Sequence, residues 1–386
     1  MLHNAYGVGG TIRTVINQAN ALCPDHDVEI ASVYHTRAAP VFPVDPRVRL
    51  VPLTELRPDG SRRTDPPDGN TRAARHLRHL PNPLPHRHDG RYRRWDPFVD
   101  AAIVRYFRSA GEGILVTTRP ALNLLSAGTA PRHLIRVAQD HMNFASYRRG
   151  LRTAIIRNYR RLDAVTVLTQ HDLRDYQRAL GGCGVRLACI PNGIPPRDAP
   201  RAAYEAKQVV AAGRLTAQKG FDMLLDAYRP VAARYPDWTL TIHGGGAWHE
   251  RLTAQRDRLG LHDVVRLPGL TRHLDRELAA SSIFVLSSRV EGLPMALLEA
   301  MSTGLPPVAF DCPTGPGEVI DDGVNGRLVP PGDIGALAAA LSELIEDPDR
   351  RRAMGTEAYR TSRRFFMPAV RDAWAEFFAA LVAGRR

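Results

Sequence analysis

Glu291 and Glu299 lie eight residues apart in the segment RVEGLPMALLEA. The apolar run IFVLSS comes directly before them, so we expect Glu291 in a strand-to-helix turn and Glu299 in the second turn of the helix. A helix N-terminus offers unpaired N–H groups and a positive dipole end to a phosphate, and Gly292 lets backbone approach a ligand. Carboxylates in these two places can accept hydrogen bonds from sugar hydroxyls. Two glutamates at this spacing are often plain surface charges, but an EGLP turn behind a buried strand favours a binding site.

A second glycine turn between a strand and a helix is AGRLTAQKG, residues 212–220. Arg214 offers a planar fork and Lys219 a compact ammonium, and both fit phosphate oxygens. Lys219 is one of only two lysines, with Lys207, among 52 basic residues. An ammonium at this turn therefore indicates a chemical requirement. The spacing is not GxxxxGK[ST], which disfavours a Walker-type site.

The elements that must position these residues alternate between strands and helices in both halves of the chain, which predicts parallel sheets with helices on both faces. In the first half we expect strands at 27–34, 48–53, 113–117, 133–138, 163–168 and 185–190, with a helix at 169–180. In the second half we expect strands at 208–212, 239–243, 264–267, 283–287, 307–310 and 326–329, and helices at 221–234, 294–303, 334–345, 349–364 and 369–383.

Two such halves predict two doubly wound, Rossmann-like domains that face each other across a cleft, with ligands outside the carboxyl ends of the strands. We place an N-terminal acceptor-binding domain at 1–190, a proline-rich linker at 191–207 and a donor-binding domain at 208–366. The last segment, 367–386, is expected to pack back on the N-terminal domain.

The composition is that of a globular chain with a strong basic balance: 386 residues, a net charge of +12 and 24% charged residues. No apolar run approaches the roughly 18–20 residues that a membrane span needs, and no leader pattern opens the sequence, so we expect a cytoplasmic protein. The charge suits an anionic partner. Without a helix-turn-helix, zinc-finger or RNP-like motif, nucleic acid is not expected to be that partner.

The segment from Arg57 to Asp96 departs from the alternating pattern, since it is rich in Pro, Arg and His and carries 10 Arg against 5 Asp. Apart from a short helix expected at 73–80, it shows little periodicity. It is either a surface insertion that follows the arginine bias of the chain or a basic flap that contacts an anionic acceptor or lipid head groups.

Several segments together resemble glycosyltransferase family 4, of GT-B architecture, within the glycosyl transferases group 1. The matching pieces are PNGI (191–194), GRLTAQKG (213–220), HGGG (243–246), VRLPG (265–269), EGLPMALLEAMSTGLP (291–306) and VNGRLVPPGD (324–333). The resemblance covers nearly all of residues 185–366 and is looser before residue 185.

The resemblance implies roles for individual residues. Arg214 and Lys219 would bind the donor diphosphate and stabilise the departing charge, Glu299 would hold the ribose, and Glu291 would contact the transferred sugar. In the N-terminal half, His141 matches the histidine that contacts the donor sugar; His133 is its competitor but begins a strand rather than ending one. Further donor contacts are implied for the glycine turns and for the EGLP backbone, at Gly9, Gly10, Gly213, Gly244, Gly246, Gly292, Leu293 and Pro294.

The resemblance also implies the reaction: a retaining hexosyl transfer from a nucleotide-diphosphate sugar, without a metal and without a cofactor. Asp-X-Asp occurs at Asp25–Asp27 and Asp347–Asp349, but both lie at the start of elements, away from the carboxyl ends of strands. We therefore expect Arg214, Lys219 and helix termini to neutralise the leaving group.

The sequence leaves open which acceptor is used and which of several classes of protein this chain belongs to. The expected acceptor is a glycan, a lipid-linked glycan or a phosphate-bearing polymer, with peripheral contact to an anionic inner membrane face. The alternatives are another GT-B enzyme, such as a nucleotide-sugar epimerase, and a non-catalytic basic binding protein.

One departure from the resemblance concerns the first strand. Only MLHNAY precedes the glycine turn GVGG, which is too short for a full buried strand. We expect residues upstream of Met1 to supply that strand.

Overall fold

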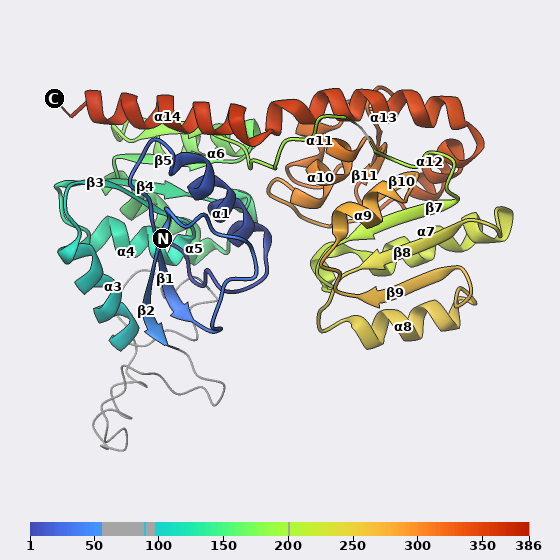
Figure 1. The fold of residues 1–386 in the computed structure, drawn as a ribbon, viewed down its shortest axis with the longest axis horizontal. Helices are drawn as coiled ribbons and strands as arrows, with labels where there is room; N and C mark the ends of the chain where they lie inside the picture. The colour runs from blue at the N-terminus through green and yellow to red at the C-terminus, as the bar shows by residue number, and fades with distance from the viewer. Residues whose placement is uncertain (56–88, 90–96, 200, 386) are drawn as a thin grey trace, which may run out of the picture. The chain divides into compact units, whose positions relative to one another are not determined.

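The computed structural model describes residues 1–55, 89, 97–199 and 201–385. The expected basic segment Arg57–Asp96, with its helix at 73–80, lies outside the described residues except for Asp89. The chain divides into two compact units, Met1–Gly193 with Met367–Arg386, and Ile194–Phe366 (Figure 1). They are called the first and the second unit below.

The second unit is built on one parallel sheet of six strands in the order β12-β11-β10-β7-β8-β9. The strands are β7 (Gln208–Ala212), β8 (Thr239–His243), β9 (Val265–Gly269), β10 (Ile283–Leu286), β11 (Pro307–Phe310) and β12 (Arg327–Val329). The expected strands agree with these to within two residues at each end. Short apolar runs of this kind are typical of strands buried on both faces.

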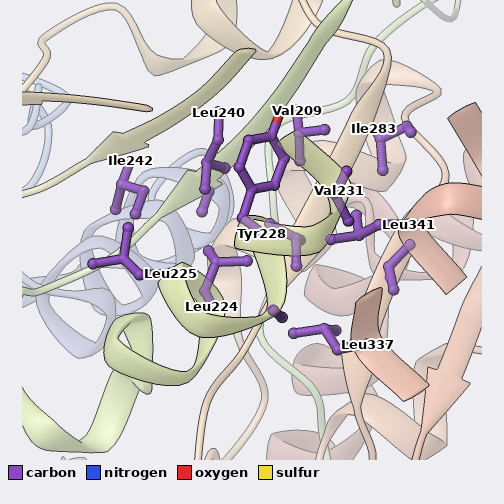
Figure 2. Close-up of a cluster of buried hydrophobic side chains, with 14 of the residues drawn as sticks. Val209, Leu224, Leu225, Tyr228, Val231, Leu240, Ile242, Ile283, Leu337 and Leu341 are labelled. Carbon is purple, nitrogen blue, oxygen red and sulfur yellow. The ribbon is translucent and has the colours of Figure 1, made fainter. Parts of the chain in front are cut away.

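Helices join these strands and cover the sheet. They are α7 (Phe221–Arg234), α8 (His249–Arg258), α9 (Leu274–Ala279), α10 (Met295–Thr303), α11 (Pro316–Val319), α12 (Ile334–Glu346) and α13 (Pro348–Ser362). Figure 2 shows α7 side chains, among them Leu224 and Tyr228, packed with Val209 and Leu240 from the sheet and Leu341 from α12. Burial of this apolar stripe, rather than helix propensity alone, holds α7 and α12 on the sheet.

The strand order reverses between β7 and β10. The chain runs outward from β7 through β8 to β9, and then returns to the other side of β7 as β10 before it continues to β11 and β12. In open α/β sheets such a reversal leaves a crevice outside the carboxyl ends of the two central strands, because the following loops turn to opposite faces. The loops after β7 and β10 are those that carry Lys219 and Glu291.

The first unit contains two parallel sheets instead of the one expected. One has the order β1-β2, with β1 (Glu29–His35) and β2 (Arg49–Glu55); the other has the order β3-β4-β5-β6. The four strands of the second sheet are β3 (Gly113–Thr117), β4 (Leu134–Gln139), β5 (Ala164–Val167) and β6 (Arg186–Cys189). Leu2 forms only an isolated parallel bridge to Ser32, so no complete strand joins the two sheets within the described part of the chain.

The helices of the first unit are α1 (Gly10–Leu22), α3 (Pro97–Ser109), α4 (Pro120–Thr129), α5 (Arg149–Asn158), α6 (Gln170–Leu180) and α14 (Met367–Ala383). The C-terminal helix α14 belongs to this unit, where Trp374 is buried together with Leu22 of α1 and with Ile135 and Val137 of β4. An aromatic side chain buried among aliphatic neighbours contributes a large share of such a contact.

The segment expected to link the domains is divided between the units after Gly193. Ile194 donates to Phe365 O, and the amides of Arg201 and Ala202 donate to Thr303 O. Because these backbone bonds tie the segment to α10 and to the end of the second unit, Ile194–Lys207 groups with the second unit.

Candidate functional site

The centre of the candidate site is an ion pair between Lys219 and Glu291. Lys219 Nζ lies 2.5 Å from Glu291 Oε1, and the Ser288 hydroxyl donates to the same oxygen at 2.5 Å. The side chains are 17% and 7% exposed, so both charges are largely removed from water. The pair spans the loops after β7 and β10, at the reversal of strand order.

Further contacts lock these two loops together. Gln218 Nε2 donates to Val290 O at 2.9 Å, and the Arg289 amide donates to Gln218 O at 2.8 Å. Gly220 has φ +62°, and a Cβ there would meet Ser287 O at 2.0 Å, so only glycine lets the loop turn so close to β10. The position of Lys219 is thus set by backbone contacts rather than by its own long side chain.

The glycines predicted at the turns form a closely packed backbone floor. A Cβ on Gly244 would lie 1.8 Å from Gly213 O, and one on Gly246 would lie 2.4 Å from Leu215 O. The aliphatic stem of Lys219 lies over Gly213, at 3.3 Å from a Cβ built there. The loops after β7 and β8 therefore approach each other more closely than side chains would permit.

The EGLP turn is buried and leads into α10. Glu291 donates its amide to Pro313 O at 2.8 Å and accepts from the Thr314 amide at 2.9 Å. Pro294, expected inside the first helical turn, is instead the N-cap of α10, which begins at Met295. Gly292 and Leu293 precede it, and the amides of Leu297 and Leu298 donate to Pro294 O at 3.1 and 3.3 Å.

Glu299 and Arg214, the other two predicted donor contacts, differ in exposure. Glu299 is buried on α10, 6% exposed, in the second turn as expected. Arg214 is exposed directly after Gly213. Of the four predicted side chains of the second unit, Lys219 and Glu291 are brought into direct contact by the ion pair.

In the first unit, His141 follows β4, and its Nε2 atom is buried without a hydrogen-bond partner among the described residues. Burial lowers the pKa of the His141 imidazole to about 4. The competing His133 is exposed, and its ring contacts Ala110 O at 3.0 Å. A buried ring nitrogen with nothing to bond is costly unless something else satisfies it, which favours His141 as the functional residue.

Asp140, which the sequence did not single out, is buried directly before His141. The hydroxyls of Tyr147 and Tyr159 donate to its carboxyl oxygens at 3.3 Å, and the Tyr176 hydroxyl also donates to it. Burial raises the pKa of Asp140 to about 7, against the hydrogen bonds from the tyrosines, which lower it. A buried proton-binding group and a buried neutral imidazole thus lie side by side at the end of β4.

Gly9 and Gly10 stand where a phosphate-binding turn would need them. Gly10 is the first residue of α1, and Gly9 is its N-cap with no side-chain hydrogen bond to the helix. The first amides of this 13-residue helix have no side-chain cap. Such an end suits an anion.

No three His, Cys, Asp or Glu side chains gather in the described ranges in a way that could hold a metal ion. Of the two Asp-X-Asp sequences, Asp347 caps α13 by accepting from the Arg350 amide at 2.9 Å. Metal independence stays a prediction. Within the described part of the chain, no helix has the length and apolar character that a bilayer crossing requires.

Two supporting contacts were missed from sequence. Ser288 touches Glu291, and Arg289 forms a two-point ion pair with Asp222 at 2.9 and 2.8 Å, which fixes the start of α7 against the loop after β10. A serine pair at a strand end (LSSRVEG) and an acidic residue in the first helical turn (GFD) are the available signals, but both patterns are common.

Comparisons with known proteins agree with this geometry. Residues 197–361 match the family model described as glycosyl transferases group 1. The chain is similar in structure to sucrose-phosphate synthase from Thermosynechococcus elongatus, with a TM-score of 0.78, 19% identity and coverage of 100% of this chain and 98% of that one. It is also similar to Anabaena HepE in complex with UDP and glucose, with a TM-score of 0.70, 20% identity and 98% coverage of both. The chain therefore carries a glycosyl transferases group 1 domain over residues 197–361 and has the GT-B fold.

Among sequence relatives is an exopolysaccharide phosphotransferase of Streptomyces coelicolor, 36% identical over 98% of this chain. The chain spans 40% of the length of that relative. More than half of the relative thus lies outside the similarity.

The neighbouring buried groups Asp140 and His141 predict opposite pH dependences of stability. Asp140 binds its proton more tightly when folded, so its stabilising contribution is complete at about pH 4 and is lost as pH rises through about 7. His141 binds its proton less tightly when folded, so its contribution is absent below about pH 4 and is gained as pH rises through its ordinary pKa of 6.5.

Urea unfolding at several pH values checks this. The free energy of unfolding of the wild type minus that of Asp140→Asn should fall between pH 4 and 7, whereas wild type minus His141→Gln should rise between pH 4 and 6.5. Equal, flat differences for both variants would show that neither group titrates abnormally in the folded protein.

Proposed function

We propose that this chain is a retaining glycosyltransferase that takes a hexose from a nucleoside-diphosphate sugar bound at the β7/β10 reversal. The observation that carries the proposal is the Lys219–Glu291 pair, which places a cation and a carboxylate at the point where parallel α/β sheets bind ligands. The cation suits the diphosphate, and the carboxylate suits hydroxyls of the sugar.

Because the Lys219–Glu291 pair is buried, its charges act strongly on a bound ligand. Lys219 is held over the Gly213 turn by backbone contacts, so its ammonium needs little rearrangement to meet phosphate oxygens that arrive at the same loop. Preorganised charge in a water-poor site stabilises the negative charge that develops on a departing nucleoside diphosphate. Arg214, exposed after Gly213, can supply a second, two-point contact to the phosphates.

The other proposed donor contacts lie on α10, on the backbone ahead of it and in the first unit. Glu299 on α10 binds the ribose hydroxyls, and the backbone from Gly292 to Pro294 with the N-terminus of α10 lies along sugar and phosphate. His141, with Gly9 and Gly10 at the start of α1, serves the donor sugar and phosphates from the first unit. The charge on the leaving group is neutralised by Lys219 and Arg214, so no metal and no cofactor takes part.

The proposed acceptor is an anionic cell-envelope glycan, either lipid-linked or phosphate-bearing. The net charge of +12 supports it, because a basic surface attracts polyanions and anionic lipid surfaces. We also propose that the protein meets this acceptor at the inner face of the membrane.

One prediction of the proposed function concerns the two lysines, of which one lies in the site and the other on the surface. Lys219→Ala should lower turnover on the order of 10²-fold, about 2.7 kcal/mol, since it removes a cation that stabilises the leaving charge. Lys207, which pairs with Asp237 on the surface, is the matched control, and Lys207→Ala should leave turnover unchanged. Steady-state kinetics on both variants measure this difference. Equal turnover in the two variants would contradict the proposed contact between Lys219 and the donor diphosphate.

Another prediction of the proposed function concerns the products. A hexosyl transfer breaks the bond between the anomeric carbon and the diphosphate, so the released nucleotide is a nucleoside diphosphate. Transfer of a sugar phosphate would instead break the diphosphate itself and release a nucleoside monophosphate; the Streptomyces relative is named a phosphotransferase. With UDP-, GDP- and TDP-hexoses and a panel of neutral and phosphate-bearing glycans, we expect the diphosphate, a retained anomeric configuration by NMR, and a preference for charged acceptors.

The same assay tests the metal-free mechanism, since activity should survive excess EDTA. Release of the monophosphate would replace the proposal by phosphotransfer. Loss of activity on chelation, with recovery on adding Mg²⁺ or Mn²⁺, would overturn metal independence but leave the donor site in place.

A further inference from the structure

A basic surface lies on α5 of the first unit and on the single turn that follows this helix, Tyr159–Arg161. Five of its arginines are exposed and Arg152 is half-buried. The surrounding segment, residues 141–162, contains no Asp and no Glu. The six residues, called the arginine face below, are Arg148, Arg149, Arg152, Arg157, Arg160 and Arg161.

The charge of the arginine face is not neutralised by its neighbours. None of the six guanidinium groups pairs with an acid in the ranges that the structure describes. The helix α4, which packs against α5, carries no charged side chain at all. The face is therefore a concentrated positive surface that is open to an anion from solution.

The arginine bias of the chain does not account for this surface. The other described helices with two or more arginines are α3, α6, α7, α8 and α13, and each of them also carries Asp or Glu. Arg148 and Arg149 stand at the N-terminal end of α5, whose first turn has no acid. Cations at that end of a helix oppose its dipole, so helix stability does not favour them there. An anionic ligand would favour them.

Two tyrosines fix the arginine face to the end of β4. Tyr147, ahead of α5, and Tyr159, behind it, donate from their hydroxyls to the buried carboxyl of Asp140, each at 3.3 Å. Asp140 directly precedes His141, which the proposed function assigns to the donor sugar. Because both ends of the helix are tied to one buried group, its outer face keeps a constant place relative to His141.

The length of the face suits a ligand with several phosphates. From Arg149 to Arg160 it extends about 17 Å at the helical rise of 1.5 Å per residue. Guanidinium groups bind phosphate oxygens by two-point contacts, and a row of them can hold successive phosphates of one chain. Contacts that are linked in this way reinforce one another, whereas a single phosphate gains only one of them.

The face is less suited to a lipid surface. No large apolar side chain among residues 141–162 is exposed. A helix that lies on a bilayer buries an apolar face beside its basic one. A dissolved polyanion therefore fits the arginine face better than a membrane does.

We propose that the arginine face of α5 is the docking surface for the acceptor, and that the acceptor is a polymer with phosphodiesters along its backbone. The inference rests on the proposed function, because it names the acceptor class of that same transferase. The arginines hold phosphates of the polymer, and the unit that receives the sugar continues from the face toward the end of β4. The face provides affinity and register for the acceptor and takes no part in the bond that breaks.

The experiment measures the binding of purified poly(glycerol phosphate) by calorimetry in the absence of any donor. One variant replaces Arg149, Arg152, Arg157 and Arg160 with Gln. The matched control replaces four exposed arginines that already pair with acids on other helices, so that both variants lose four positive charges. These are Arg178, Arg234, Arg352 and Arg360.

The variant of the arginine face should bind the polymer at least about tenfold more weakly than the wild type. The slope of log affinity against log salt should fall by roughly one for each arginine removed, because each phosphate contact releases a counterion. The control should stay within about twofold of the wild type, since exposed ion pairs contribute little. Lys at the four positions of the face should restore most of the affinity, which shows that the loss with Gln is not misfolding.

Three results would overturn the proposal: no binding of the polymer by the wild type, equal losses in the Gln variant and the control, or an equal loss for glycerol phosphate itself. A Gln variant that loses binding to phosphatidylglycerol vesicles but keeps its affinity for the polymer would assign the face to a membrane instead. In transfer assays the Gln variant should raise the KM for the polymer, while its affinity for a nucleoside diphosphate stays that of the wild type. Because the binding measurements use no donor, a chain that binds the polymer as described but transfers no hexose would contradict the proposed function and leave the docking surface in place.

Discussion

The second unit depends on one constraint, the reversal of strand order between β7 and β10. It sends the loops after these strands to opposite faces of the sheet and leaves their starts side by side, where Lys219 and Glu291 meet at 2.5 Å. The cost of holding two charges with so little water is offset by their mutual attraction and by the Ser288 hydroxyl. Such a pair is a weak source of stability, but it holds a cation and a carboxylate where the proposed donor would present its diphosphate and its sugar hydroxyls.

Much of this was predictable from sequence because the signals are local. The strands 208–212, 239–243 and 307–310 were predicted with the bounds that the structure has. Short apolar runs that are bounded by turn residues usually form buried strands. The placement of Lys219 and Glu291 at strand ends followed from the same runs. Their direct contact did not, because it depends on strand order, and strand order is set by how distant segments pack.

The misses have physical reasons as well. Asp140 was passed over because a lone aspartate carries no pattern; its burial depends on Tyr147, Tyr159 and Tyr176, which come from separate segments. Pro294 was placed one position too far into α10, since proline suits both the first helical turn and the position ahead of it. The single sheet expected in the first unit appears as two, because among the described residues only an isolated bridge from Leu2 to Ser32 lies beside β1 where a connecting strand would pair.

The central claim, that Lys219 meets the donor diphosphate, can be tested at that atom because the chain has only two lysines. Reductive ¹³C-methylation labels Lys219, Lys207 and the terminal amine and keeps their charge. When a nucleoside diphosphate is titrated in, the Lys219 methyl signal should shift in step with binding measured by calorimetry, while the Lys207 signal stays in place. Binding that leaves the Lys219 signal unmoved would contradict the account.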